Sequence, residues 1–220
     1  MYNAYTEIFQ QGAHLHRVLK SMLSRKEDIR TFFAENDYDE ILFVACGSSY
    51  WASLSASMTV QEKLGVRCTP IKAGDVVMNS AYYQKAYHKP LLLIPSRSGS
   101  TSEVIQAVTL LKDAYDCKLF SLVEYENSKM KEMSDFCVEF PWVNEISVCQ
   151  TRSFSAMYLS MVLVGALVGN DDALIADLDA YFANHQQHSE EAQRFVQSVL
   201  GDYSGVPAIV ALGHGKQYGG

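Results

Sequence analysis

The feature that most constrains the fold is a regular alternation of short apolar runs with longer segments of helical character. Five apolar runs of strand length lie at residues 41–45, 66–71, 91–94, 118–123 and 136–140. The segments between them can each hold a helix, and they span residues 49–64, 75–87, 102–115 and 127–134. Strands that alternate with helices are typical of a parallel sheet covered on both faces. The sequence therefore predicts an α/β fold in which a five-stranded parallel sheet lies between two helical layers.

Further helical segments flank the predicted sheet. Residues 2–36 carry apolar positions at near-helical spacing and predict two N-terminal helices, and residues 147–169 predict one long apolar helix. A strand at 206–212 is followed by a glycine-rich turn and no helix, so we expect it to open a second, incomplete unit. The predicted organisation is N-terminal helices at 1–36, the sheet domain at 37–170, a connecting helix at 171–204 and the second unit at 205–220.

Composition excludes several functional classes. A net charge of -7 without a block of like charges argues against a general nucleic-acid surface, which requires clustered lysine and arginine. The N-terminal residues lack the features of a signal peptide, and the five cysteines are scattered without a C-x-x-C pair, which favours reduced thiols in the cytoplasm. The longest apolar stretch, residues 156–169, is shorter than the ~20 residues that span a bilayer, and it predicts a buried helix. We therefore expect a cytoplasmic protein that binds neither nucleic acid nor membrane.

The same apolar stretch bears on assembly. We expect the helix at 156–169, together with the incomplete unit at 205–220, to leave hydrophobic surface that a partner covers. The prediction is a homo-oligomer, at least a dimer.

Two loops rich in hydroxyl side chains follow the first and third predicted strands. The sequence CGSSY occupies residues 46–50, and SRSGST occupies residues 96–101. In the common doubly wound strand order 2-1-3-4-5, the first and third strands are neighbours, and their carboxyl ends border a ligand-binding crevice. Each loop also opens a predicted helix, so hydroxyls and unsatisfied backbone N–H groups meet in this crevice.

A phosphate monoester suits such a crevice, because helix N-termini favour anions and hydroxyls donate hydrogen bonds to them. Gly47 and Gly99 allow close backbone approach or a positive φ angle, and Arg97 either adds a positive charge or pairs with a surface carboxylate. The alternative is that these serines merely cap helices. Neither loop is a Walker A or a G-x-G-x-x-G motif, so nucleotide binding is not expected.

Three motifs in this order resemble the sugar isomerase (SIS) domain family. FVACGSSYWA (43–52) resembles that family's C-G-T-S-Y loop, SRSGSTSE (96–103) its S-x-S-G-E-T loop, and NEISVCQTRSFS (144–155) its E-x-x-V-A-S-T-K-A-F-T segment. The resemblance covers roughly residues 40 to 220 and implies a flavodoxin-like, three-layer αβα domain. Such domains commonly occur with a second copy, and LGHGKQYGG at the end of the chain resembles the start of one.

The resemblance also implies a set of ligand contacts. It places a sugar phosphate against the side chains of Ser48, Ser49, Ser96, Arg97, Ser98 and Thr101, with Val148 near the sugar. Arg97, Ser100, Gln150 and Arg152 stand where relatives commonly have glutamine, glutamate, serine and lysine. The candidate site for an amino- or keto-hexose 6-phosphate therefore consists of Gly47, Ser48, Ser49, Ser96, Arg97, Ser98, Gly99, Thr101 and Val148.

Catalytic residues are harder to assign. Aldose–ketose isomerisation needs a base that moves a proton between neighbouring carbons, and in the resembled two-domain enzymes the acid–base groups come from the second domain. Glu103 is the best carboxylate within this chain, although a first-turn glutamate is also favoured by the helix dipole alone. His185 and His188 lack a third metal ligand, so neither a metal nor a cofactor is expected.

Three functional classes remain open. The first is a phosphosugar isomerase, deaminase or aminotransferase-type enzyme. The second is a non-catalytic sugar-phosphate sensor of the kind fused to DNA-binding domains, although residues 1–40 are not notably basic. The third is a structural partner that keeps the fold without turnover.

Overall fold

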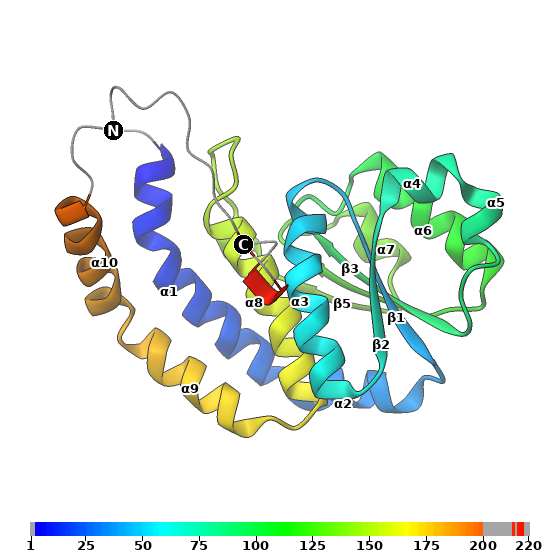
Figure 1. The fold of residues 1–220 in the computed structure, drawn as a ribbon, viewed down its shortest axis with the longest axis horizontal. Helices are drawn as coiled ribbons and strands as arrows, with labels where there is room; N and C mark the ends of the chain where they lie inside the picture. Colours follow the sequence, from blue (N-terminus) through cyan, green and yellow to red (C-terminus); the bar gives the residue numbers. More distant parts are fainter. Residues whose placement is uncertain (1–2, 200–212, 214, 218–220) are drawn as a thin grey trace.

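The computed structural model describes residues 3–199, 213 and 215–217. Its centre is a five-stranded parallel sheet with the strand order β2-β1-β3-β4-β5, as the sequence predicts. The strands are β1 (Glu40–Ala45), β2 (Arg67–Lys72), β3 (Pro90–Ser96), β4 (Leu119–Val123) and β5 (Phe136–Glu139). The direction in which successive strands are added to the sheet therefore reverses between β1 and β3 (Figure 1).

Alternate side chains of the central strands enter two separate cores. Phe43 and Leu93 face a large core, whereas Val44 and Ile94 face a smaller one on the opposite side of the sheet. Nearly continuous burial of β1, β3 and β4 explains why these strands read as unbroken apolar runs in the sequence.

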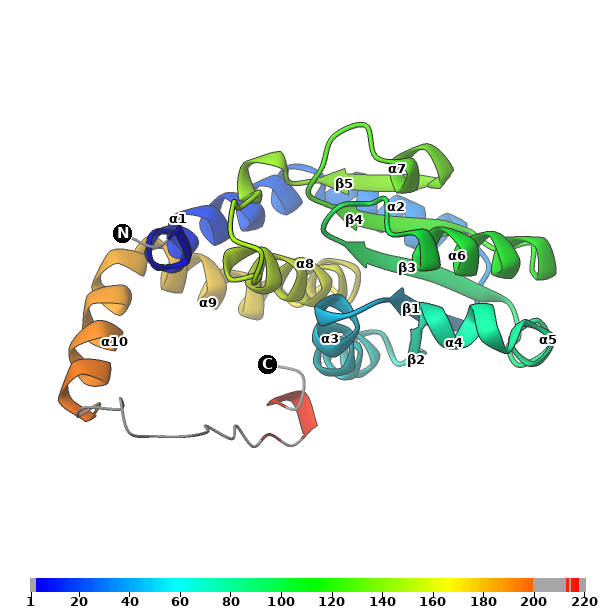
Figure 2. The same cartoon turned by 90° about the horizontal axis from the view of Figure 1, so that it is seen from above.

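Helices cover both faces (Figures 1 and 2). The larger core is closed by α1 (Asn3–Ser24), α2 (Lys26–Glu35), α3 (Ser48–Leu64) and α8 (Arg152–Val168). The smaller core is closed by α4 (Ala73–Met78), α6 (Ser102–Ala114) and α7 (Lys129–Met133), with the short α5 (Ser80–Tyr83) beyond α4. The three-layer αβα prediction is confirmed.

The predicted helix at 147–169 is wrong at its start, because α8 begins only at Arg152. Residues before it form a loop in which the Glu145 carboxylate accepts hydrogen bonds from the Thr151 backbone N–H (3.0 Å) and Oγ1 (2.7 Å). This side chain satisfies backbone donors that a longer helix would have satisfied itself.

The expectation that residues 156–169 leave exposed apolar surface is also wrong. α8 is buried along most of its length, since α1, α2, α3 and α9 all pack around it. Close packing with α3 is possible at Gly165, where a Cβ atom would lie 3.1 Å from the Cα of Val60. Within the described residues, no helix is long and apolar enough to cross a membrane.

Two helices replace the single connecting helix predicted at 171–204. They are α9 (Asp172–Ala183) and α10 (His185–Val199), and they are separated at Asn184. The Asn184 side chain donates to the carbonyl of Ala180 (2.9 Å), which ends α9 locally. Figure 1 shows both helices curving along α1, away from the sheet.

The predicted strand at 206–212 lies outside the described residues. Beyond it, a short 3₁₀ turn, η2 (Gly215–Gln217), lies against α3. There the Lys216 ammonium pairs with the Glu62 carboxylate.

Candidate functional site

A polar crevice of about 450 Å³ opens at the carboxyl ends of β1 and β3. Its lining comes mainly from the two hydroxyl-rich loops that the sequence singled out. The lining residues are Cys46, Gly47, Ser48, Ser49, Pro95, Ser96, Arg97, Ser98, Thr101, Val104, Tyr125 and Gln150. The topology thus brings the two loops together where parallel α/β sheets bind ligands.

The first loop turns from β1 into α3 at Gly47. This residue has a φ angle of 57°, which favours glycine because a Cβ atom disfavours left-handed backbone. Ser49 is buried in the first turn of α3, whereas Ser48 Oγ donates to Gln150 Oε1 (2.7 Å). The third sequence motif therefore reaches the crevice through Gln150.

The second loop turns from β3 toward α6 at Gly99, whose φ angle is 60°. Its hydroxyls support the turn: Ser96 Oγ accepts from the Gly99 N–H (3.0 Å), and Ser98 Oγ accepts from the Ser100 N–H (3.2 Å). A Cβ atom at Gly99 would lie 2.4 Å from Ser128 Oγ, so glycine is required here for space as well as for conformation. Gly99 is buried behind the loop and does not line the crevice.

Helix capping does not account for these hydroxyls. The residues at the N-caps of α3 and α6 are Gly47 and Thr101, and no side chain makes a capping hydrogen bond at either helix. By contrast, Ser128 caps α7 and Asp171 caps α9 with side-chain oxygens. The starts of α3 and α6 therefore present backbone donors to the crevice without a side-chain acceptor of their own.

Arg97 is the cation of the crevice lining. Its Nη2 donates to the carbonyl of Glu145 (2.8 Å), and its Nε lies 4.0 Å from Glu124 Oε2. The Arg97 side chain is only 19% exposed. The sequence left open whether Arg97 pairs with a surface carboxylate, and the structure pairs it with a buried one.

Glu124, directly after β4, is the residue near the site that the sequence reading missed. Its side chain is fully buried, and Oε2 accepts a hydrogen bond from Ser153 Oγ (2.8 Å). Burial raises the pKa of this carboxyl from 4.5 to about 7, against the lowering effects of Ser153 and Arg97. Its position at the carboxyl end of a strand next to β3 was a usable signal, because the crevice runs along that edge.

The loop before α8 is tied down from two directions. Glu7 on α1 accepts hydrogen bonds from the backbone N–H groups of Ile146 (2.7 Å) and Ser147 (3.3 Å), and hydrogen bonding to Ser147 lowers the pKa of Glu7. Glu145 holds the other end through Thr151. Val148, at the tip, is 94% exposed and does not line the crevice.

Glu103 also lies outside the crevice lining. It is exposed in the first turn of α6, where the Ser102 hydroxyl donates to its Oε2 (3.3 Å). Seven of the ten site residues named from the sequence line the crevice, and Gly99, Glu103 and Val148 do not. Gln150 also lines the crevice, and Cys46, Pro95, Val104 and Tyr125 complete the lining without having been named.

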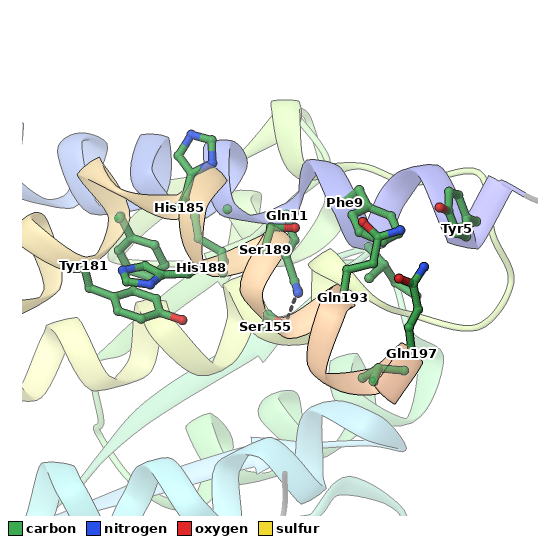
Figure 3. A pocket seen from close by; sticks show the side chains of 16 residues that line it. Tyr5, Phe9, Gln11, Ser155, Tyr181, His185, His188, Ser189, Gln193 and Gln197 are labelled. Carbon is green, nitrogen blue, oxygen red and sulfur yellow. Dashed lines mark hydrogen bonds between the residues drawn. The ribbon is translucent and has the colours of Figure 1, made fainter. Parts of the chain in front are cut away.

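A second concave region is an apolar groove of about 590 Å³ between α1, α9 and α10 (Figure 3). His185 and His188 lie here, and the His188 ring stacks on Tyr181 with centroids 4.4 Å apart. Across the described residues, no group of three or more histidine, cysteine, aspartate or glutamate side chains is placed to hold a metal ion.

The chain is similar to proteins of known family and fold. A family model described as the SIS domain matches residues 36–169. A glutamine–fructose-6-phosphate aminotransferase (isomerizing) from Shewanella oneidensis is 24% identical over 231 residues, covering 96% of this chain and 36% of that protein. The chain thus spans about a third of that relative.

Two solved structures share the fold. A glucosamine-6-phosphate deaminase from Thermotoga maritima superposes with a TM-score of 0.74 at 24% identity, covering 90% of this chain and 58% of that one. A tagatose-6-phosphate ketose/aldose isomerase from Escherichia coli superposes with a TM-score of 0.73 at 17% identity, covering 90% of this chain and 54% of that one.

Proposed function

The chain belongs to the SIS domain family, and on that premise we propose that its crevice binds the phosphate of an amino- or keto-hexose 6-phosphate. The observation that carries the proposal is the convergence of Ser48, Ser49, Ser98 and Thr101 with the Arg97 guanidinium in one cavity. Hydroxyl and backbone donors at two helix starts, with one cation beside them, suit a phosphate dianion. The relatives described above are named for the 6-phosphates of fructose, glucosamine and tagatose, which agrees with this ligand class.

Thermal melts of the purified protein test the proposal. Fructose 6-phosphate and glucosamine 6-phosphate should raise the melting temperature, because a ligand that binds only the folded state stabilises it by mass action. Fructose and glucosamine at equal concentration should raise it much less. Equal shifts from phosphorylated and unphosphorylated sugars would mean that the crevice does not recognise phosphate.

We further propose that the chain contributes to an isomerase, deaminase or aminotransferase-type reaction on that sugar phosphate. Phosphate anchoring would position the sugar carbons above the crevice, where proton transfer takes place. Glu103 is the base we propose within this chain, and it would have to act from outside the crevice lining described above. Turnover that disappears in Glu103→Gln, while ligand binding persists, is the expected result.

One observation favours a second function, a sugar-phosphate sensor without turnover. Among the described residues that line the crevice, none is a histidine, aspartate, glutamate or lysine. Such a site can hold a phosphate but lacks the imidazole, carboxylate and amine groups that most often transfer protons. Binding without detectable isomerisation or deamination, in both the wild type and Glu103→Gln, would support the sensor.

We also propose that the protein is a cytoplasmic homo-oligomer. Support for self-association comes from the groove between α1, α9 and α10, where Tyr5, Ile8, Phe9, Tyr181 and Val196 are each at least 36% exposed. Apolar surface of this kind is typical of protein interfaces. Light scattering should give a mass of at least twice 24.6 kDa, and a monomer at high concentration would contradict the proposal.

A further inference from the structure

Glu124 and Arg97 form an unusual pair behind the crevice. Arg97 Nε and Glu124 Oε1 are both buried, and neither has a hydrogen-bond partner in the described part of the chain. The Nε to Oε2 distance of 4.0 Å makes the contact an ion pair rather than a hydrogen bond. The two charges therefore attract each other at close range while each retains an unsatisfied polar atom.

Stability alone does not account for this arrangement. Burying a carboxylate carries a large desolvation penalty, and apolar side chains in place of a buried ion pair are often neutral or stabilising. The raised pKa of Glu124 expresses the same penalty. Strained electrostatics of this kind are concentrated at functional sites.

The surroundings of Arg97 indicate what the pair does. The Glu145 carbonyl accepts a hydrogen bond from Nη2, and the Glu124 carboxylate lies near Nε. Arg97 is also part of the crevice lining. Two sides of the guanidinium thus face groups of the protein, and Nη1 has no acceptor among the described residues.

We propose that Glu124 is a positioning residue for Arg97. Its buried carboxylate attracts the Nε side of the guanidinium, the Glu145 carbonyl holds Nη2, and Nη1 stays available to the phosphate of the ligand. Ser153, at the start of α8, holds Glu124 in turn. This inference rests on the proposed phosphate site and extends it to a residue that the ligand does not touch.

Binding of fructose 6-phosphate, measured by isothermal titration calorimetry, tests the inference in a double-mutant cycle. Arg97→Gln should weaken binding at least about tenfold, because a charge-assisted hydrogen bond is lost. Glu124→Gln keeps the size of the side chain and an acceptor for Ser153 but removes the charge, and it should weaken binding about fivefold to tenfold. In the Arg97→Gln background, Glu124→Gln should change the affinity less than twofold.

Glu40→Gln is the matched control. Glu40 is also buried, has an unpartnered Oε2 and lies 4.0 Å from an arginine Nε, that of Arg67. It occupies the opposite, amino end of β1, remote from the crevice. Its substitution should leave the affinity for fructose 6-phosphate within twofold of the wild-type value.

A spectroscopic measurement without ligand provides a second readout. The Nε–H resonance of Arg97, assigned by its loss in Arg97→Gln, should exchange slowly with water in the wild type and faster in Glu124→Gln. Should Glu124→Gln fail to fold, Glu124→Asp replaces it, with an expected affinity loss of about threefold that again depends on Arg97.

The outcomes separate the inference from the proposed function. If the wild type binds neither fructose 6-phosphate nor glucosamine 6-phosphate, the proposed function is wrong and the inference falls with it. If the wild type binds and Glu124→Gln binds equally well, only the inference is wrong. An equal loss from Glu124→Gln with and without Arg97 would also overturn it, because Glu124 would then act by another route.

Discussion

The crevice and the groove are two concave regions of the described part of the chain, and they differ in origin as well as in chemistry. The groove is larger, at about 590 Å³ against about 450 Å³, and is lined mainly by aromatic and aliphatic side chains from three helices. The crevice is lined by hydroxyls, backbone and one arginine at the edge of the sheet. Size alone would select the groove, whereas position and polarity select the crevice as the ligand site.

The two regions depend on the sheet to different degrees. In the crevice, the strand order fixes both loops at one edge, so the positions of Gly47 and Gly99 follow from β1 and β3. The groove depends on how α9 and α10 return along α1, which no strand dictates.

The largest effect should come from removing two hydroxyls of the crevice. Ser49→Ala combined with Ser98→Ala should cost about 3 to 6 kcal/mol of binding free energy, at ~1.5 to 3 kcal/mol for each hydrogen bond to a charged group. Protection of the protein by fructose 6-phosphate in thermal melts should then vanish. Ser189→Ala, a serine of the groove, is the control and should retain full protection.

The second effect is a dependence of the protein's stability on pH, caused by the buried carboxyl group of Glu124. Burial raises the pKa of Glu124 to about 7 from an ordinary value of 4.5. Between these values the folded state holds a proton that the unfolded chain has lost, so stability falls as pH rises. The contribution is fully present below about pH 4.5 and is lost as pH rises through about 7.

A difference of this size corresponds to about 3 kcal/mol, at ~1.4 kcal/mol for each pKa unit. Urea denaturation at about pH 5 and about pH 8 should show that Glu124→Gln loses less stability with rising pH than the wild type by roughly that amount. Parallel behaviour of the two proteins would show that Glu124 carries its charge without such a penalty.

The third effect compares Gly47 and Gly99, the glycines at which the two loops turn. Gly99→Ala should destabilise the protein by about 2 to 3 kcal/mol, since left-handed backbone and a clash with Ser128 act together. Gly47→Ala meets nothing within 4 Å and should cost only about 1 kcal/mol, for the φ angle of 57°. Urea midpoints measure both, and equal losses would mean that the contact with Ser128 relaxes freely.

The sequence predicts much of the fold and part of the candidate site. The order of the strands and the meeting of Ser48 with Ser98 at one edge followed from alternation and from the doubly wound rule. The position of Glu124 after β4 was a signal for the site, but its burial and its contacts with Ser153 and Arg97 could not be predicted, because a single glutamate after a strand is usually solvent-exposed. The late start of α8 depends on side-chain contacts of Glu145, which helical periodicity does not register.

The smallest effect on the crevice should come from the groove. Val196→Asp places a charge at an exposed position of α10, so the free energy of unfolding should change by no more than about 0.5 kcal/mol. The same charge opposes burial of the groove in an interface, so light scattering should show weaker self-association. Fructose 6-phosphate should still bind with an affinity within twofold of the wild-type value, because no crevice residue contributes to the groove. A parallel loss of self-association and ligand affinity would break the comparison, since the crevice would then depend on a second copy of the chain.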